Sequence, residues 1–158
     1  MPVGWRLAAP EFGESVEDML SGEGPRQYGG RWNSPGLAAV YLGDSLALAA
    51  MELLVHLRNI DVLGTYRTLP IYIPDEVVMH IEPAELPPGW ESGARTTTRA
   101  IGDRWLADGS SVALQVPSAV IASETNFVLN PAHRDMRRLR SGPLSDFRFD
   151  PRSGSSSG

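Results

Sequence analysis

The sequence predicts an α+β domain with mostly antiparallel strands and a few helices. Short apolar segments that alternate with polar residues and end at Gly or Pro dominate the chain, which is typical of strands. Segments with the length and apolar spacing of helices are few. Strands and helices do not alternate regularly, which argues against a parallel sheet of βα repeats. With 158 residues, the chain is long enough for one domain with its own core.

The first part of the chain is expected to begin with a strand over Val3–Ala8, followed by a short helix over Glu14–Leu20. Ser21–Gly30 is rich in glycine and is expected to form turns. A second strand is expected over Leu37–Leu42. Either Asp44 or Ser45 can cap the N-terminus of the helix that follows, which is expected to end near Asn59.

The middle of the chain is expected to contain a strand pair, a loop and a second long helix. Thr65–Ile73 and Val77–Ile81 have alternating patterns and are expected to pair through a connection at Pro74-Asp75. Pro83–Gly93 contains several prolines and glycines, so a surface loop is expected. Arg95–Ala107 has helical spacing.

The last part of the chain is expected to be strand-rich. Ser111–Val116 and Ala119–Ser123 are predicted strands that Pro117-Ser118 interrupts, and Asp146–Phe149 is a candidate final strand. Residues 153–158 contain only Ser and Gly, so a disordered tail is expected there. We therefore expect the folded domain to occupy residues 1–152.

The composition limits the classes of function. The chain has 14 basic and 19 acidic residues, and its net charge of −5 argues against nucleic-acid binding as its main role. Cysteine is absent, which excludes disulfides and thiolate metal sites. There is no secretory leader and no apolar run of membrane-spanning length, so a cytoplasmic protein without membrane contact is expected. All basic residues are arginines, whose planar guanidinium groups can bind phosphate through two hydrogen bonds; those in the cluster 134–140 are expected on a solvated face.

Glu52 is the most informative single residue, because it lies within the apolar run Ala47–Val55. An ionised carboxylate in such a helix requires a partner or a cavity. One interpretation is a surface glutamate paired with Arg58 or Arg95. The other is a functional carboxylate that faces a ligand.

A metal site is not predicted. The three histidines, His56, His80 and His133, are far apart in the sequence, and no H-E-x-x-H motif occurs. Glu52 and His56 could supply two ligands from one helix face, but a third ligand cannot be identified.

Several motifs together resemble one known family, the RES domain. They follow one another in the order and spacing of that family over about residues 5–152: Gly30-Arg31-Trp32-Asn33, Tyr41, the helix around Glu52, Gly102-Asp103-Arg104-Trp105, Val116-Pro117-Ser118-Ala119 and Asn130-Pro131-Ala132-His133. The resemblance implies a core like that of ADP-ribosyltransferases. It also implies a bacterial toxin that consumes NAD and is paired with an Xre-type helix-turn-helix antitoxin.

The same resemblance implies a choice of reactions. Some RES proteins release nicotinamide by hydrolysis or phosphorolysis, and others transfer ADP-ribose to a protein such as phosphoribosyl pyrophosphate synthetase. The acceptor in this chain, whether water, phosphate or a protein, is left open by the sequence. A different class of function, a non-catalytic module of the same fold that binds a nucleotide or a protein, is the alternative.

Cleavage of the nicotinamide–ribose bond requires a phosphate clamp, a surface for the pyridinium ring and negative charge near the ribose. Arg31, next to two glycines, is the candidate clamp, although an ordinary surface ion pair would also suit an arginine. Tyr41 is the candidate stacking surface, with simple packing as the alternative. Glu52 is the candidate that stabilises the oxocarbenium ion or acts as a base.

Further cofactor contacts are expected from four residues. Ser118 follows a proline at a strand end, where its hydroxyl can either reach a cleft or cap a turn. Arg6 is a candidate second phosphate contact, and Tyr28 is a second candidate aromatic surface. Asn130, in a turn with His133, is expected at the site's edge. Trp32 is expected in the core rather than at the ligand.

Overall fold

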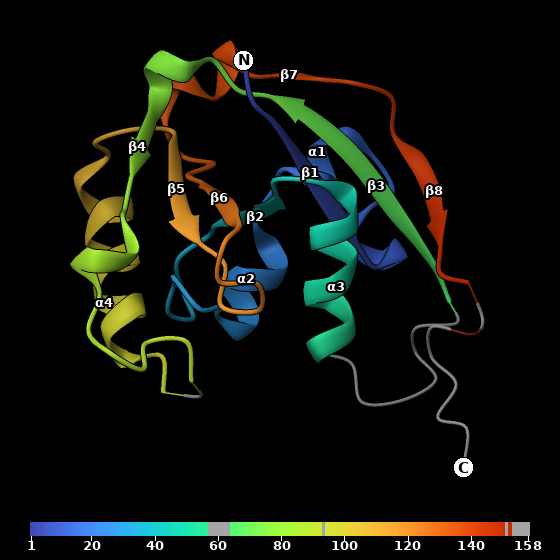
Figure 1. The fold of residues 1–158 in the computed structure, drawn as a ribbon. Coiled ribbons are helices and arrows are strands. Elements are labelled where there is room, and N and C mark those ends of the chain that lie inside the picture. The colour runs from blue at the N-terminus through green and yellow to red at the C-terminus, as the bar shows by residue number, and fades with distance from the viewer. Residues whose placement is uncertain (57–63, 93, 151, 153–158) are drawn as a thin grey trace.

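The computed structural model describes residues 1–56, 64–92, 94–150 and 152. Within these residues the strands form one sheet of eight (Figure 1). They are β1 (Val3–Ala8), β2 (Val40–Gly43), β3 (Thr65–Tyr72), β4 (Val78–His80), β5 (Ala113–Pro117), β6 (Thr125–Leu129), β7 (Arg140–Ser141) and β8 (Ser145–Arg148). The helices are α1 (Val16–Met19), α2 (Glu23–Tyr28), α3 (Leu46–His56) and α4 (Thr96–Asp108). Short 3-10 turns cover Pro10–Phe12, Asp75–Val77, Pro83–Glu85 and Arg134–Arg138.

The strand order is β4-β5-β6-β2-β1-β3-β7, and β8 also pairs with β3. β4 and β5 are parallel, and the other strand pairs of the described residues are antiparallel. The predicted α+β class with mostly antiparallel strands is therefore confirmed. No helix in the described part of the chain is long and apolar enough to cross a membrane.

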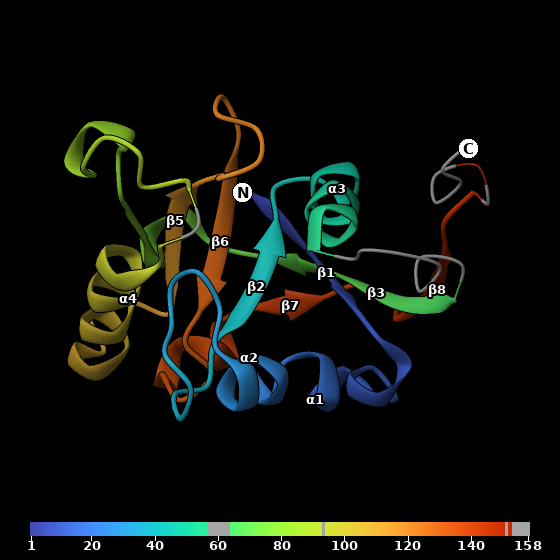
Figure 2. The same cartoon turned by 90° about the horizontal axis from the view of Figure 1, so that it is seen from below.

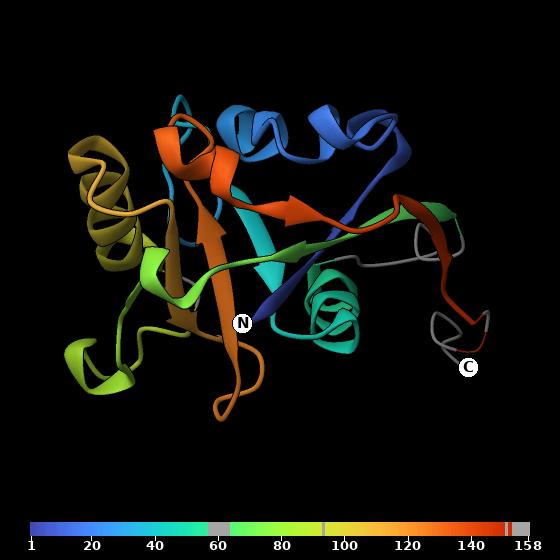
Figure 3. The same ribbon diagram turned by 90° about the horizontal axis from the view of Figure 1, so that it is seen from above.

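Helices cover different parts of the sheet. Figures 2 and 3 show α3 on one side of β1 and β2, the α1–α2 segment on the other side, and α4 beside the β4–β5 end. Alternation along β1 explains the two-sided packing, because Leu7 packs with the α3 side and Ala8 packs in the cluster that contains Met19 of α1. Trp32, as expected, is buried, and it packs in a third cluster with Trp105 of α4.

The expected turn at Ser21–Gly30 is wrong in part, because α2 lies within it. Gly22, with a φ of 70°, precedes this helix, and Gly29, with a φ of 75°, ends it. Pro25 is in the first helical turn, where a missing N–H costs nothing. Glycine and proline thus mark the ends of a short helix here rather than an irregular loop.

The strand expected over Ala119–Ser123 is also wrong. The amides of Val120 and Ile121 both donate to the side-chain oxygen of Ser118, at 3.1 and 3.0 Å, so this segment is a turn. The strand that pairs with β5 comes later and is β6.

The expected pair of strands around Pro74 does not form. β3 instead pairs with β1, β7 and β8, and β4 pairs with β5. The 3-10 turn Asp75–Val77 follows Pro74 directly and turns the chain toward the far end of the sheet.

The other expected elements are present with small shifts in their ends. They correspond to β1, α1, β2, α3, the 83–92 segment, α4, β5 and β8. The cap of α3 is Ser45, whose hydroxyl oxygen accepts a hydrogen bond from the Leu48 amide at 3.0 Å. The expected end of this helix near Asn59 and the tail 153–158 lie outside the described residues.

Candidate active site

A cleft of about 500 Å³ lies between α2, α3 and the loop that precedes β2. Five of the residues proposed from the sequence line it, and they come from separate segments of the chain: Arg6, Tyr28, Arg31, Tyr41 and Glu52. Other lining side chains that matter below are Trp5, Val55, His56, Glu91, Arg95, Val120 and Asn126.

The Glu52 carboxylate is held by two neutral donors. The Ser118 hydroxyl donates to Oε1 at 2.7 Å, and the Asn126 amide donates to the same oxygen at 2.6 Å. Among the described residues, Glu52 is not part of a surface ion pair. Arg95 lines the same cleft, but the salt bridges of the described residues do not include a pair between Arg95 and Glu52. Arg58 lies outside the described residues.

Ser118 lies beneath Glu52 and is only 1% exposed. Its single hydroxyl proton is directed to Glu52, while its oxygen accepts the two amides of the following turn. Ser118 therefore caps a turn, as one of the two possibilities considered for it, and it does not itself line the cleft. Its contact is with the carboxylate, so in this geometry it orients Glu52.

The guanidinium of Arg31 extends along one wall of the cleft. Its NH1 donates to the Trp90 carbonyl at 3.2 Å, and burial, followed by the nearby charge of Arg95, lowers its pKa. One edge of the guanidinium is thus fixed by a neutral acceptor. None of the salt bridges of the described residues includes Arg31.

Tyr41 braces the loop that carries Arg31. Its hydroxyl donates to Asn33 Oδ1 at 2.6 Å and accepts from the Trp32 amide at 3.0 Å. Burial raises the pKa of this hydroxyl, which is therefore neutral at physiological pH. A Cβ on Gly30 would lie 2.5 Å from the Tyr41 oxygen, so glycine at this position allows the loop to approach the tyrosine rather than a ligand.

Helix α4 holds the same loop from behind. Thr98 Oγ1 donates to the Arg31 carbonyl at 2.6 Å, and Arg99 Nε donates to the Gly30 carbonyl at 2.8 Å. Asp103 accepts from the amide and the hydroxyl of Ser34, at 2.8 and 2.5 Å. The backbone on both sides of Arg31 is therefore fixed by one helix face, which preorganises the arginine.

Replacing Gly102 of α4 with alanine is expected to destabilise the protein by at least about 2 kcal/mol, because overpacking against rigid backbone cannot relax. The added Cβ would lie 1.6 Å from the Trp32 carbonyl oxygen. Gly24→Ala is the matched control, since the nearest atom to a Cβ there is 3.9 Å away and alanine favours helices by up to about 1 kcal/mol. Urea unfolding of both variants checks this. Equal free energies of unfolding for the two variants would show that α4 does not pack tightly against the loop.

Arg6 is a half-buried cation whose hydrogen bonds go to neutral carbonyl oxygens, at Met19 and Leu7, 3.2 and 3.0 Å away. Burial lowers its pKa to about 10, so it is still charged at neutral pH. None of the salt bridges of the described residues includes Arg6. A guanidinium with no ion-pair partner among the described residues is able to bind an anion such as a phosphate. Tyr28, at the mouth, is 73% exposed.

His56 follows Glu52 by one helical turn and lines the same cleft. Burial, followed by the charge of Arg95, lowers its pKa, so this imidazole is neutral at pH 7. No group of three or more potential metal ligands occurs among the described residues.

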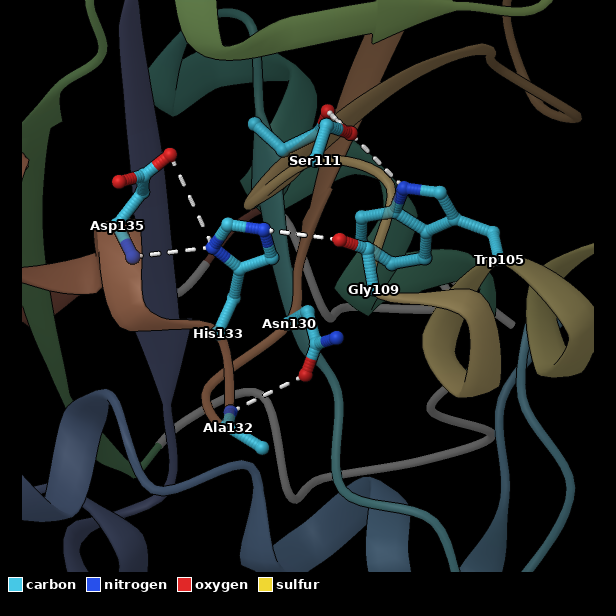
Figure 4. Close-up of polar contacts among 8 residues, drawn as sticks. Trp105, Gly109, Ser111, Asn130, Ala132, His133 and Asp135 are labelled. Carbon is cyan, nitrogen blue, oxygen red and sulfur yellow. Dashed lines mark hydrogen bonds and ion pairs between the residues drawn. The ribbon is translucent and has the colours of Figure 1, made fainter.

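Asn130, which was expected to contact the cofactor, lies outside the cleft. Its amide donates to the Leu106 carbonyl at 3.2 Å. Its oxygen accepts from the Ala132 amide at 3.1 Å (Figure 4). His133 lies beside it, accepting from the Asp135 amide and contacting the Gly109 carbonyl, both at 3.0 Å. Through these hydrogen bonds, the turn that follows β6 is held against the C-terminal end of α4. Neither Asn130 nor His133 lines the cleft around Glu52.

Asn126 and Arg95 are site residues that sequence reasoning missed. Asn126 is a polar residue next to the apolar run Phe127–Leu129, which is a signal similar to that of Glu52. Asn126 was not identified from the sequence because the strand of this region was expected over Ala119–Ser123, whereas β6 begins at Thr125. Arg95 was considered only as a partner for Glu52.

Together, the fold and the cleft define a single α+β domain in which arginines surround one oriented carboxylate. The RES domain family model matches residues 4–150, and the chain belongs to the RES domain family.

The chain is 42% identical to Toxin Res of Yersinia enterocolitica over 135 residues, which cover 84% of this chain and 88% of that protein. It is 36% identical to the Prs ADP-ribosylating toxin of a Sphingobium species over 152 residues, covering 94% of both. The fold is similar to that in the crystal structure of the M. tuberculosis MbcT-MbcA toxin-antitoxin complex, with a TM-score of 0.77 and 23% identity over 96% of this chain and 85% of that one.

Proposed function

We propose that this chain is the toxin of a toxin–antitoxin pair and that it cleaves the nicotinamide–ribose bond of NAD. The observation that carries the proposal is the oriented Glu52 carboxylate in a cleft that also contains Arg6 and Arg31, two cations whose hydrogen bonds go to neutral carbonyls. The names of the relatives, a Toxin Res and an ADP-ribosylating toxin, support the same function.

In this proposal Arg6 and Arg31 bind the pyrophosphate, and the Tyr41 ring forms part of the wall against which the nicotinamide lies. The bond between the ribose C1′ and the nicotinamide nitrogen breaks, and its electron pair leaves with nicotinamide. Positive charge then develops on the ribose, and Glu52 stabilises it. A nucleophile attacks C1′ and gives its proton to a base, for which Glu52 and the neutral His56 are within the same cleft.

A module that only bound a dinucleotide could use a carboxylate to accept hydrogen bonds from the ribose hydroxyls, but its negative charge would be unfavourable near the phosphates. Negative charge in a cation-lined cleft weakens ground-state binding of phosphates, but it stabilises a transition state in which the ribose becomes positive. Catalysis therefore explains Glu52 better than simple binding does.

The acceptor of ADP-ribose can be assigned by experiment. Purified protein is incubated with NAD labelled on its adenine in three parallel reactions: buffer alone, buffer with phosphate, and bacterial lysate. Free ADP-ribose identifies water as the acceptor, a phosphorylated ADP-ribose identifies phosphate, and label on a protein band identifies transfer to protein. Intact NAD in all three reactions would contradict the proposed activity.

We also propose that an Xre-type antitoxin covers the cleft, since unrestrained NAD cleavage would kill the host. Val55 is 58% exposed and lies at the mouth. Val55→Asp is expected to weaken inhibition by the co-expressed antitoxin about 10-fold or more, because a charge would be buried at the contact. Met79→Asp is the control, as this exposed residue of β4 does not line the cleft. The measurement is the ratio of inhibited to uninhibited activity. Equal ratios for both variants would place the antitoxin elsewhere.

A further inference from the structure

We propose that Asn126 is a positioning residue that fixes the direction of the Glu52 carboxylate, so that Oε2 alone is presented to the ligand. This inference rests on the proposed function only in the identity of that ligand, the ribose of NAD. Its geometric basis is independent of the reaction.

The first observation is that two donors converge on one oxygen. Asn126 Nδ2 lies 2.6 Å from Glu52 Oε1, and Ser118 Oγ lies 2.7 Å from the same atom. These donors come from β6 and from the end of β5, whereas Glu52 lies on α3. Three elements therefore fix one side of the carboxylate, and the opposite oxygen is the one available to a ligand.

The second observation is the packing that brings α3 to this strand. In the sheet, Asn126 is opposite Gly43 of β2. A Cβ on Gly43 would lie 2.7 Å from the Ala49 amide nitrogen, so the glycine allows α3 to lie directly against the sheet here. Glu52 is on the same helix face as Ala49, one turn later, and therefore reaches the Asn126 amide.

The third observation is an unsatisfied atom. Asn126 Oδ1 is buried and has no hydrogen-bond partner among the described residues. Buried polar atoms without partners are rare and call for an explanation. Turning the amide over would direct its oxygen at the Glu52 carboxylate, so that two acceptors would face each other. The Glu52 acceptor oxygen thus dictates the orientation of Asn126, and this orientation leaves Asn126 Oδ1 without a partner among the described residues.

The physical consequence is that the two donors hold Oε1 against the protein and leave Oε2 for a ligand. Other charged or titratable groups line the same cleft: Arg6, Tyr28, Arg31, Tyr41, His56, Glu91 and Arg95. They are unchanged in the variants below, so a difference between variants reports on residue 126.

The test uses Asn126→Asp, which keeps the shape but replaces the donor with a second carboxylate. Two carboxylates at this distance share one proton, and their protons are released in two coupled steps. We expect the acid limb of the kcat/KM profile for NAD to move to higher pH by about one unit or more. We also expect kcat at pH 7 to fall on the order of 10-fold to 100-fold, the size of effect that misplaced reacting groups produce.

Asn126→Ala is the second variant, and it separates positioning from folding. It removes both the donor and the orphaned oxygen, so kcat is expected to fall about 10-fold or more with little change in KM and no loss of thermal stability. The matched control is Gln115→Glu. This change converts an amide to a carboxylate on the neighbouring strand β5, where the amide bonds Thr125 and does not line the cleft. The pH profile of the control is expected to match that of the wild type.

A titration without NAD distinguishes failure of this inference from failure of the proposed function. In the Asn126→Asp variant, the carboxyl ¹³C resonances of labelled Glu52 and of the introduced aspartate are expected to titrate together in two coupled steps. Independent titration of the two carboxyl groups, or variants that lose activity only in proportion to stability and keep the wild-type pH profile, would overturn the role of Asn126. A wild-type protein that leaves NAD intact, but whose variant shows coupled titration, would refute the reaction and leave the positioning role standing.

Discussion

Glu52→Gln is expected to fold normally and to cleave NAD about 10²–10³-fold more slowly than the wild type, the loss typical of one preorganised electrostatic group. The amide oxygen of glutamine can still accept the hydrogen bonds from Ser118 and Asn126, so the local structure should survive. What disappears is the negative charge beside the developing positive charge of the ribose. Because that charge develops only in the transition state, kcat is expected to fall more than KM rises.

The control for this prediction is Glu17→Gln, an identical change on the exposed face of α1. Both variants are compared with the wild type by circular dichroism and steady-state NAD cleavage. Wild-type turnover by a folded Glu52→Gln protein would show that the carboxylate does not act in the reaction.

Arg31→Lys is expected to fail to restore the activity that Arg31→Ala loses, although arginine and lysine carry the same charge. The Arg31 guanidinium donates to the Trp90 carbonyl with one nitrogen, and in the proposed function the rest of its planar group binds the cofactor. An ammonium group is a single, strongly hydrated contact and cannot make both interactions in one plane. We expect kcat/KM to fall on the order of 10²-fold in both variants, with KM raised and kcat lowered, because the phosphate contact positions the whole cofactor.

Arg104→Lys serves as the control, since Arg104 is on the exposed side of α4, where its side chain is 86% exposed and pairs with Asp108. A folded Arg31→Lys enzyme with wild-type kcat and KM would mean that Arg31 acts through charge alone, or away from the cofactor.

Local sequence patterns were sufficient to predict the helix around Glu52, because a single carboxylate in an apolar run is conspicuous and Ser45 is a good cap. Arg31 and Tyr41 were also accessible from sequence, since they lie in a compact motif. The interpretation of Gly30 as a residue that lets the backbone approach a ligand was incomplete, however. Its close neighbour is the Tyr41 hydroxyl, a contact that depends on how the loop folds back on β2.

Asn126 and Asn130 show why the rest of the site could not be predicted. The two asparagines are four residues apart, yet one contacts Glu52 and the other caps a turn next to α4. Which of them reaches the cleft depends on where β6 begins, and that start is set by the Ser118 turn. Strand pairing between distant segments, such as β4 with β5, is likewise decided by tertiary packing rather than by local pattern.

The support that α4 gives to the Arg31 loop is likewise decided by tertiary packing rather than by local pattern. Thr98, Arg99 and Asp103 are ordinary helix residues in the sequence, and only the fold brings them against the Arg31 loop. The loop itself is short and contains glycines, so it requires this external support to keep the arginine in place.

The measurement that tests the central claim most directly is the release of nicotinamide from NAD by the purified chain, followed over time without antitoxin. The Glu52→Gln variant is measured alongside at equal concentration. We expect nicotinamide to appear with multiple turnovers in the wild-type reaction and about 10²–10³-fold more slowly with the variant. If the folded wild-type protein binds NAD but releases no nicotinamide in the presence of water, phosphate and lysate, the cleft is a binding site and the proposed catalysis is wrong.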